Sequence, residues 1–484
     1  MAGLFQWGER VRSTHERALY IGLSVLVSLW FALGTSALIT DAPLRYDAAQ
    51  NINIAYRFIH TGEFTFGGKA KKAMKREPVP VLVAAAWLLL HPSFENYKNA
   101  DLKTGRLTST VKLANVFWEF VAALFIFLLC LELFQKPLVA GIGGVFALAI
   151  SDMTFLSTSQ VIDTLLNELP AAALMLVASW CAVRFVRDPT IGRALSLGIA
   201  LGILSLTKAA FFSIGLGFIL LLALVEWRKL IYGTDSQSHR QVRKLYAVLV
   251  LAMLATITPW IARNAINYGR FEMIAGRGEG ILGVRMMLAE LPSLGVLYAS
   301  SPPPLKDRLG PVLGYSQSDL EPGGRLAIFN THPEAQWYAF DSQRKAEGYA
   351  GTNEQWLRRK AFWSAVERPF EYLTSVGLFA YRGMWFMQPS GLAGRLNPMV
   401  FCALSAFSLL CLLGVFFGGL IAGNRVLVAV FGLAVGAFFF YSALSYGLPR
   451  YIAPNTPFAA IAVFWVLNYF IRAGRRVAAT STVQ

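Results

Sequence analysis

Long apolar runs separated by short polar connections make up most of the chain. A helix needs about 20 predominantly apolar residues to cross a bilayer, and the pattern predicts ten spans. The predicted spans are 18–39, 107–134, 137–156, 168–186, 194–207, 210–226, 245–262, 398–421, 426–445 and 453–471. We interpret 194–226 as a hairpin of two short helices with Lys208 at the turn, because a single helix of that length would be too long for a bilayer.

Two other apolar stretches do not fit as spans. Residues 79–90 are too short and are bracketed by prolines, and residues 370–388 contain Arg382. We expect both to be interfacial helices that lie on the outer leaflet. The predicted fold class is an all-α polytopic membrane protein. We expect a transmembrane bundle of about ten helices, outer-face interfacial helices and a small mixed extracytoplasmic domain.

Basic residues collect in alternate connections and give the bundle an orientation. These connections carry Lys136, Arg184, Arg187, Arg193, Arg228, Lys229, Arg240, Arg243, Lys244 and Arg425. Cytoplasmic loops hold such an excess of Lys and Arg, and an even number of spans puts both termini on the same side. We therefore expect both termini in the cytoplasm.

The same pattern leaves two large segments outside, residues 40–106 and 263–397. The predicted organisation is an N-terminal transmembrane module, 1–262, that carries the first outer loop. An extracytoplasmic loop domain, 263–397, and a C-terminal transmembrane module, 398–484, follow it. No internal repeat is visible, so the pattern does not favour a transporter built from inverted repeats.

The composition and charge of the chain limit the classes of molecule that it can be expected to bind. Of 484 residues, 55% are hydrophobic and 15% charged, against roughly 25% charged residues in soluble domains. The net charge of +16 suits membrane lipid headgroups or an acidic ligand, and no module for nucleic acid is present. The four cysteines lie in apolar runs and the five histidines are scattered, so no metal site is predicted. We expect no cofactor; a divalent metal is compatible with the acids but not supported.

Three acids at the outer ends of predicted spans could carry chemistry. Asp41 directly follows the first span and could be a general base for an acceptor hydroxyl or a helix N-cap. Asp47 lies in a predicted helix, 46–60, and is the second candidate for the base. Glu168, next to Asn167 at the mouth of the fourth span, could orient an acceptor or simply complement the helix dipole.

Several cations and aromatic residues also lie near the outer face. Lys208 sits between two apolar runs, where an ionisable group suggests function, although snorkelling would explain it too. Arg263 ends the seventh span, and Arg450 and Tyr451 begin the last. Five cations between residues 69 and 76, Lys72 and Arg76 among them, could attract phosphate or lipid headgroups.

Taken together, short motifs in a fixed order resemble the GT-C superfamily of integral-membrane glycosyltransferases. The family-39-like members are the most similar: protein O-mannosyltransferases, aminoarabinose–lipid A transferases and rhizobial core-oligosaccharide transferases. The motifs are an acid after the first span, a Tyr-containing helix from Tyr46 to Phe58, Gly62-Glu63-Phe64, Arg76-Glu77-Pro78, Asn167-Glu168-Leu169-Pro170, Leu206-Thr207-Lys208, Pro259-Trp260 and Arg450-Tyr451. The resemblance runs over most of the chain.

The resemblance implies an inverting glycosyltransferase at the periplasmic face of a bacterial inner membrane. It would move a hexose or pentose from a polyprenyl-phosphate donor to a glycan, lipid or protein acceptor. The implied phosphate-binding residues are Lys208, Arg263, Arg382 and Arg450. Acceptor or headgroup contacts would fall to Tyr46, Lys72, Arg76, Asn167 and Tyr451. No nucleotide-sugar fingerprint is present.

The first acidic motif departs from the family pattern. Members commonly read Asp-Glu with a Tyr four residues after the Asp, whereas here Asp41 precedes Ala42 and Tyr46 is five residues away. Either Asp41 or Asp47 is therefore left as the base, with Glu168 as the third catalytic candidate. Two alternatives stay open: a transporter or flippase for lipid-linked glycans, and a non-catalytic relative that binds polyprenyl lipid.

Overall fold

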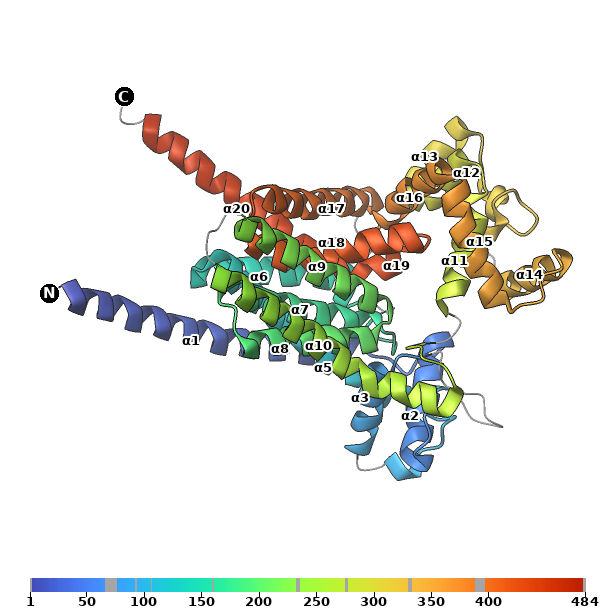
Figure 1. The fold of residues 1–484 in the computed structure, drawn as a ribbon, viewed down its shortest axis with the longest axis horizontal. Coiled ribbons are helices and arrows are strands. Elements are labelled where there is room, and N and C mark those ends of the chain that lie inside the picture. The colour runs from blue at the N-terminus through green and yellow to red at the C-terminus, as the bar shows by residue number, and fades with distance from the viewer. Residues whose placement is uncertain are drawn as a thin grey trace.

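A computed structural model describes residues 2–65, 76–91, 94–105, 107–158, 161–231, 236–274, 277–329, 333–387 and 397–481. Ten long helices in these ranges form the bundle (Figure 1). They are α1 (Ala2–Thr35), α5 (Ala114–Phe134), α6 (Pro137–Ser151), α7 (Glu168–Arg187), α8 (Ile191–Thr207), α9 (Ala210–Ile231), α10 (Ser236–Tyr268), α17 (Pro398–Ile421), α18 (Arg425–Leu444) and α20 (Thr456–Ser481). Eight helical segments of the described chain are long and apolar enough to cross a membrane. The predicted fold class is confirmed.

The expected hairpin at 194–226 is present as two helices. α8 ends at Thr207 and α9 begins at Ala210, with Lys208 in an extended conformation between them. Their apolar parts, Ile191–Thr207 and Ala210–Glu226, are shorter than the eight segments. The break is therefore a turn in the chain and not a kink in one long helix.

Short helices gather at one end of the bundle, and both termini lie at the other end (Figure 1). Next to α2 (Tyr46–Thr61), the predicted interfacial stretch 79–90 forms α3 (Pro78–Leu89), and 370–388 forms α16 (Pro369–Gly383). The remaining α-helices at this end are α4 (Thr108–Lys112), α11 (Arg277–Ala289), α12 (Ser293–Ser300), α13 (Pro303–Leu313), α14 (Pro333–Ala346), α15 (Asn353–Glu367) and α19 (Pro449–Ile452). Every regular element described between 263 and 397 is a helix.

Small residues let the central helices approach closely. α7 packs against α5, α8 and α18, and its Ala171, Ala172 and Ala173 are fully buried. α8 lies against α10, where a Cβ on Gly198 would come within 2.4 Å of the Leu249 carbonyl oxygen. Packing between small residues is a main source of helix association in lipid, because apolar surface gains little there from leaving lipid.

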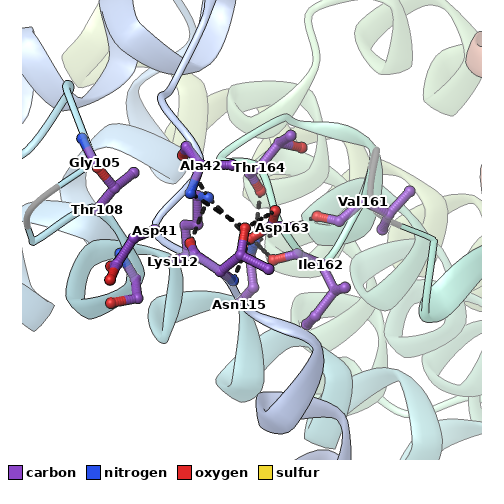
Figure 2. A network of polar contacts seen from close by, with 12 residues as sticks. Asp41, Ala42, Gly105, Thr108, Lys112, Asn115, Val161, Ile162, Asp163 and Thr164 are labelled. Atoms are coloured by element: carbon purple, nitrogen blue, oxygen red, sulfur yellow. Dashed lines mark hydrogen bonds and ion pairs between the residues drawn. The ribbon is translucent and has the colours of Figure 1, made fainter.

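A buried ion pair ties the outer end of α1 to the rest of the bundle (Figure 2). Lys112 Nζ lies 2.8 Å from Asp163 Oδ1 and donates to the carbonyl oxygens of Thr40 and Ala42, each at 2.8 Å. The Thr40 amide and hydroxyl donate to the two Asp163 carboxylate oxygens. The Lys112 side chain is 1% exposed, so its charge depends on these oxygens for compensation.

Lys112→Met is expected to lower the free energy of unfolding by about 3–5 kcal/mol, because it leaves Asp163 buried without its counter-charge. Thermal unfolding of the purified protein tests this. Lys345→Met is the matched control: its pair with Asp341 is exposed and spaced i,i+4, so it should cost about 0.5 kcal/mol or less. Equal losses of unfolding free energy from the two substitutions would contradict this role of the Lys112–Asp163 ion pair.

Candidate functional site

A cavity of about 940 Å³ lies at the outer end of the bundle. It is bounded by the start of α7, the α8–α9 turn, the end of α18, α19, and residues of α2, α11 and α15. The charged lining residues are Asp47, Glu77, Glu168, Lys208, Glu272, Arg358 and Arg450. The outer surface is thus the place where charges from distant parts of the chain meet.

Glu168, Lys208 and Arg450 form a buried cluster in the cavity wall. Arg450 Nε donates to Glu168 Oε1 at 2.9 Å, and Lys208 Nζ lies 3.6 Å from the same oxygen. The Glu168 side chain is 4% exposed, and its second carboxylate oxygen has no hydrogen-bond partner among the described residues. Two cations share one carboxylate, so the cluster keeps one positive charge.

Two tyrosines hold the Lys208 ammonium group. Nζ lies 4.7 Å from the ring centroid of Tyr451 and 5.3 Å from that of Tyr441. A cation over an aromatic face is favoured when it is shielded from water. The ammonium is therefore positioned by two rings and a carboxylate at the surface of the cavity, where an anionic group could bind.

Asp47 also lines the cavity and connects to this cluster through Arg450. Arg450 Nη2 is 3.7 Å from Asp47 Oδ2, so one guanidinium group contacts both Asp47 and Glu168. Asp47 also forms an ion pair with the buried Arg76, whose Nε donates to Gln50 Oε1 at 2.9 Å. Asp47 is held in place but keeps a quarter of its side chain exposed.

Asn167 and Glu77 form a further polar pair in the lining. Asn167 Nδ2 donates to Glu77 Oε2 at 2.8 Å and Oδ1 accepts from Asn51 at 3.3 Å. Sequence reasoning quoted Glu77 within Arg76-Glu77-Pro78 but gave it no role, and it missed Tyr441. An acid directly before Pro78, at the start of a predicted helix, could have identified Glu77 as a candidate. No local sequence feature separates Tyr441 from the other aromatic residues of its span.

Asp41 is not part of the cavity lining. Its carboxylate accepts a hydrogen bond from the Ser109 amide at 3.3 Å, at the start of α4 (Figure 2). Hydrogen bonds from Ser109 hold the pKa of the Asp41 carboxyl below its usual value. The N-cap alternative is wrong, because Arg45 is the N-cap residue of α2, the helix that follows. Asp41 instead accepts a hydrogen bond from the first turn of α4.

Two predicted phosphate ligands also lie outside the lining. Arg263 Nη2 donates to the Phe64 carbonyl at 3.0 Å, and its guanidinium group lies 4.5 Å from the Trp260 ring centroid. Arg382 stacks on Phe329 and Tyr446, and burial lowers its pKa to about 10. Both sites bury the cation among aromatic rings of the outer segments.

The twelve candidate residues thus separate into groups. The cavity lining includes Asp47, Asn167, Glu168, Lys208, Arg450 and Tyr451, with Arg76 behind Asp47. Lys72 and the side chain of Tyr46 lie outside the described part of the structure. Within the described residues, no group of three His, Cys, Asp or Glu could hold a metal ion; whether a metal is needed stays a prediction.

An apolar groove of about 650 Å³ runs down from the cavity between α9, α17 and α18. The groove and the cavity share Ser213, Phe440 and Leu444 as lining residues. Phe417 and Phe439, which line the groove, are also exposed on the outside of the bundle. The cavity with the charged cluster and the apolar groove therefore lie side by side and share part of their lining.

No protein-family model and no curated protein matches the chain. Among solved structures, the Archaeoglobus fulgidus oligosaccharyltransferase in complex with Zn and sulfate matches with a TM-score of 0.50 and 13% identity. The match covers 95% of this chain and 51% of that one. The chain has a GT-C fold. It spans about half the length of the oligosaccharyltransferase it matches.

Another solved structure is more distant. ArnT from Cupriavidus metallidurans bound to undecaprenyl phosphate has a TM-score of 0.38 and 14% identity, covering 92% of this chain and 78% of that one. The expected GT-C-like bundle is confirmed as a fold by the match to the oligosaccharyltransferase. The chemistry of the cavity in this chain has to be argued from its own residues.

Glu168→Gln is expected to tighten the binding of a soluble alkyl phosphate, because the carboxylate that competes for Lys208 and Arg450 is removed. It should also lower the free energy of unfolding by about 1–3 kcal/mol through the lost charged hydrogen bond. Calorimetric titration and thermal unfolding measure the two effects.

Glu132→Gln is the matched control for this substitution. Glu132 is buried and paired with Arg187 at the opposite end of the bundle, so it should lose stability without a change in phosphate affinity. Weaker phosphate binding by Glu168→Gln would show that the carboxylate does not compete with the anion.

Proposed function

We propose that this protein is a membrane glycosyltransferase that uses a polyprenyl-phosphate-linked sugar as its donor. The observation that carries the proposal is that the cavity, with Lys208 and Arg450 in its lining, shares lining residues with the apolar groove. A lipid phosphate has a charged head and a long apolar tail, and the two compartments match these parts in order. The GT-C fold supports the same conclusion.

In this proposal the donor phosphate binds at Lys208 and Arg450. Both are at the cavity surface, and together they exceed the charge of Glu168 by one. When the bond between the sugar C1 and the phosphate oxygen breaks, the electron pair leaves with the phosphate. The cations then stabilise the developing negative charge, which is where fixed charges lower a barrier most effectively.

We assign the general base to Asp47. It would take the proton of an acceptor hydroxyl while the acceptor oxygen attacks C1 from the face opposite the phosphate, which inverts the anomeric centre. The support is positional: Asp47 lines the cavity and Asp41 does not. Arg76 and Arg450 contact the Asp47 carboxylate and hold it in position at the cavity.

The orientation of the protein follows from its charges. The termini and the basic connections lie at the end away from the cavity, and cytoplasmic loops carry the excess of Lys and Arg. We propose that the cavity faces the periplasm of a bacterial inner membrane. The proposed acceptor is a glycan, lipid or protein that carries a hydroxyl group.

We also propose that transfer needs no metal. Each acid of the cluster already has positive partners: Asp47 contacts Arg76 and Arg450, and Glu168 contacts Arg450 and Lys208. These cations can neutralise the leaving phosphate themselves. Turnover that disappears in EDTA and returns with a divalent metal would contradict this.

Asp47→Asn is expected to reduce transfer from a polyprenyl-phosphate sugar panel by about 10²–10⁴-fold, the usual contribution of a general base. Asp41→Asn should transfer at close to the wild-type rate, because Asp41 only accepts a hydrogen bond from the first turn of α4. Glu77→Gln tests another acid of the lining. Native membrane extract supplies the acceptor.

Assays of these variants with the same donors distinguish the competing functions. Loss of turnover only in Asp41→Asn would move the base out of the cavity and overturn the assignment. Donor lipid that binds tightly without turnover in any variant would favour a non-catalytic lipid-binding protein. Movement of labelled lipid between leaflets, unaffected by Asp47→Asn, would favour a flippase.

Gly217→Leu tests the groove. Gly217 lines it, and a Cβ there meets nothing within 4 Å, so the leucine side chain should fill the groove without disturbing the packing. KM for a long-chain donor is expected to rise about tenfold or more, since each lost CH₂ contact costs about 0.8 kcal/mol. A short-chain donor should be little affected.

Gly414→Leu is the matched control, because Gly414 on α17 also faces open space but does not line the groove. Kinetics of both variants with both donors complete the test. Equal KM values for the two leucine variants with the long-chain donor would rule out the groove as the tail site.

A further inference from the structure

Large apolar side chains are exposed at the turn between α15 and α16. The exposed fractions are 62% for Phe362, 47% for Trp363, 54% for Val366, 82% for Phe370 and 64% for Leu373. We call these five residues the apolar corner. Residues 362, 363 and 366 share one face of α15, and residues 370 and 373 share one face of α16.

α16 covers a buried cation and also exposes large apolar side chains. Its inner face covers Arg285, which is 1% exposed, and the Arg285 guanidinium donates to Ser375 Oγ at 2.9 Å. The same guanidinium lies 4.1 Å from the Tyr372 ring centroid. Phe370 and Leu373 are exposed beside the exposed Glu371. A helix that exposes both apolar and charged side chains is suited to the boundary between lipid and water.

The apolar corner lies at the level where the bundle leaves the membrane. The Tyr372 hydroxyl donates to the Ala443 carbonyl at 2.6 Å, in the last turn of α18. Ala443 and its neighbour Leu444 line the apolar groove, and Leu444 is 43% exposed on the outside. The exposed surface of the corner therefore continues the apolar surface of the spanning helices.

The borders of the corner suit a membrane interface. Trp363 belongs to a residue type enriched at headgroup level. The exposed charged residues beside the corner are Arg359, Glu367, Arg368 and Glu371, and Arg368 pairs with Glu371 at 3.4 Å. Such a mixed polar border suits headgroup level, where the arginines can contact lipid phosphates. Arg358, one turn before Phe362 on α15, lines the cavity. A single helix thus connects the cavity wall with the corner.

We propose that the apolar corner is embedded in the outer-leaflet interface of the bilayer and anchors α15 there, with Arg358 at the cavity. The occupant of this surface is bilayer lipid, not a second copy of the chain or another protein. The proposal needs a membrane-spanning bundle but does not depend on the transfer reaction, so it can fail or hold independently of the proposed function.

The test uses the full-length protein with single cysteines at Phe362 and Phe370, in a background where the four native cysteines are replaced by Ala or Ser. An environment-sensitive fluorophore on each cysteine is read in phosphatidylcholine–phosphatidylglycerol vesicles. The vesicles carry nitroxide lipids labelled either near the headgroup or deep in the acyl chain. Monodisperse elution identifies the variants that fold.

Two positions calibrate the readout. Leu410→Cys lies in the middle of α17 at an exposed site and should lose emission chiefly with the deep label. Ala346→Cys is exposed on α14, which extends far from the bundle (Figure 1), and should be unaffected by both labels.

The corner probes are expected to be blue-shifted and to lose emission chiefly with the headgroup label. Emission that matches Ala346→Cys would overturn the proposal, because the corner would then face water. Blue-shifted emission without quenching, together with cross-linking between copies, would overturn it in favour of a protein interface.

Discussion

A carboxylate buried at the edge of a membrane must be neutralised, and the arrangement of the outer face depends on this requirement. Glu168 begins α7, the most enclosed helix among the described spans, and its charge is met by Arg450 and Lys208. An uncompensated charge in such a place would cost several kcal/mol. The α8–α9 turn carries Lys208 and α19 carries Arg450. Both are therefore held against the start of α7 by the same contacts that form the candidate site.

Two interruptions between helices help to bring the cations to Glu168. Lys208 is extended between α8 and α9, which sends its ammonium group to Glu168 and the two tyrosine rings. Gly447, in the connection between α18 and α19, has φ of +59°, and a Cβ there would lie 2.0 Å from the Phe379 carbonyl oxygen. Only glycine lets α16 approach this connection, just before the short helix that carries Arg450.

The cavity and the groove share lining residues, and their linings differ in charge. The cavity lining has seven charged side chains among apolar ones, whereas the groove lining has none. A ligand with a charged head and an apolar tail could lie across the two. The apolar corner is on the same helix as Arg358 of the cavity lining.

The sequence by itself predicted the membrane class, the apolar spans and the hairpin at Lys208, because hydropathy and helix breaks depend on neighbouring residues. The GT-C bundle was expected from the resemblance of short motifs in a fixed order. It also placed Asp47, Glu168, Lys208 and Arg450 among the candidates, since charges at span ends are visible locally. Only the tertiary structure decided that Asp47 faces the cavity while Asp41 accepts a hydrogen bond from α4, and that Arg263 and Arg382 lie elsewhere. Those choices depend on how Ser109, Arg76 and Arg450 approach from far along the chain, and no local pattern encodes such distances.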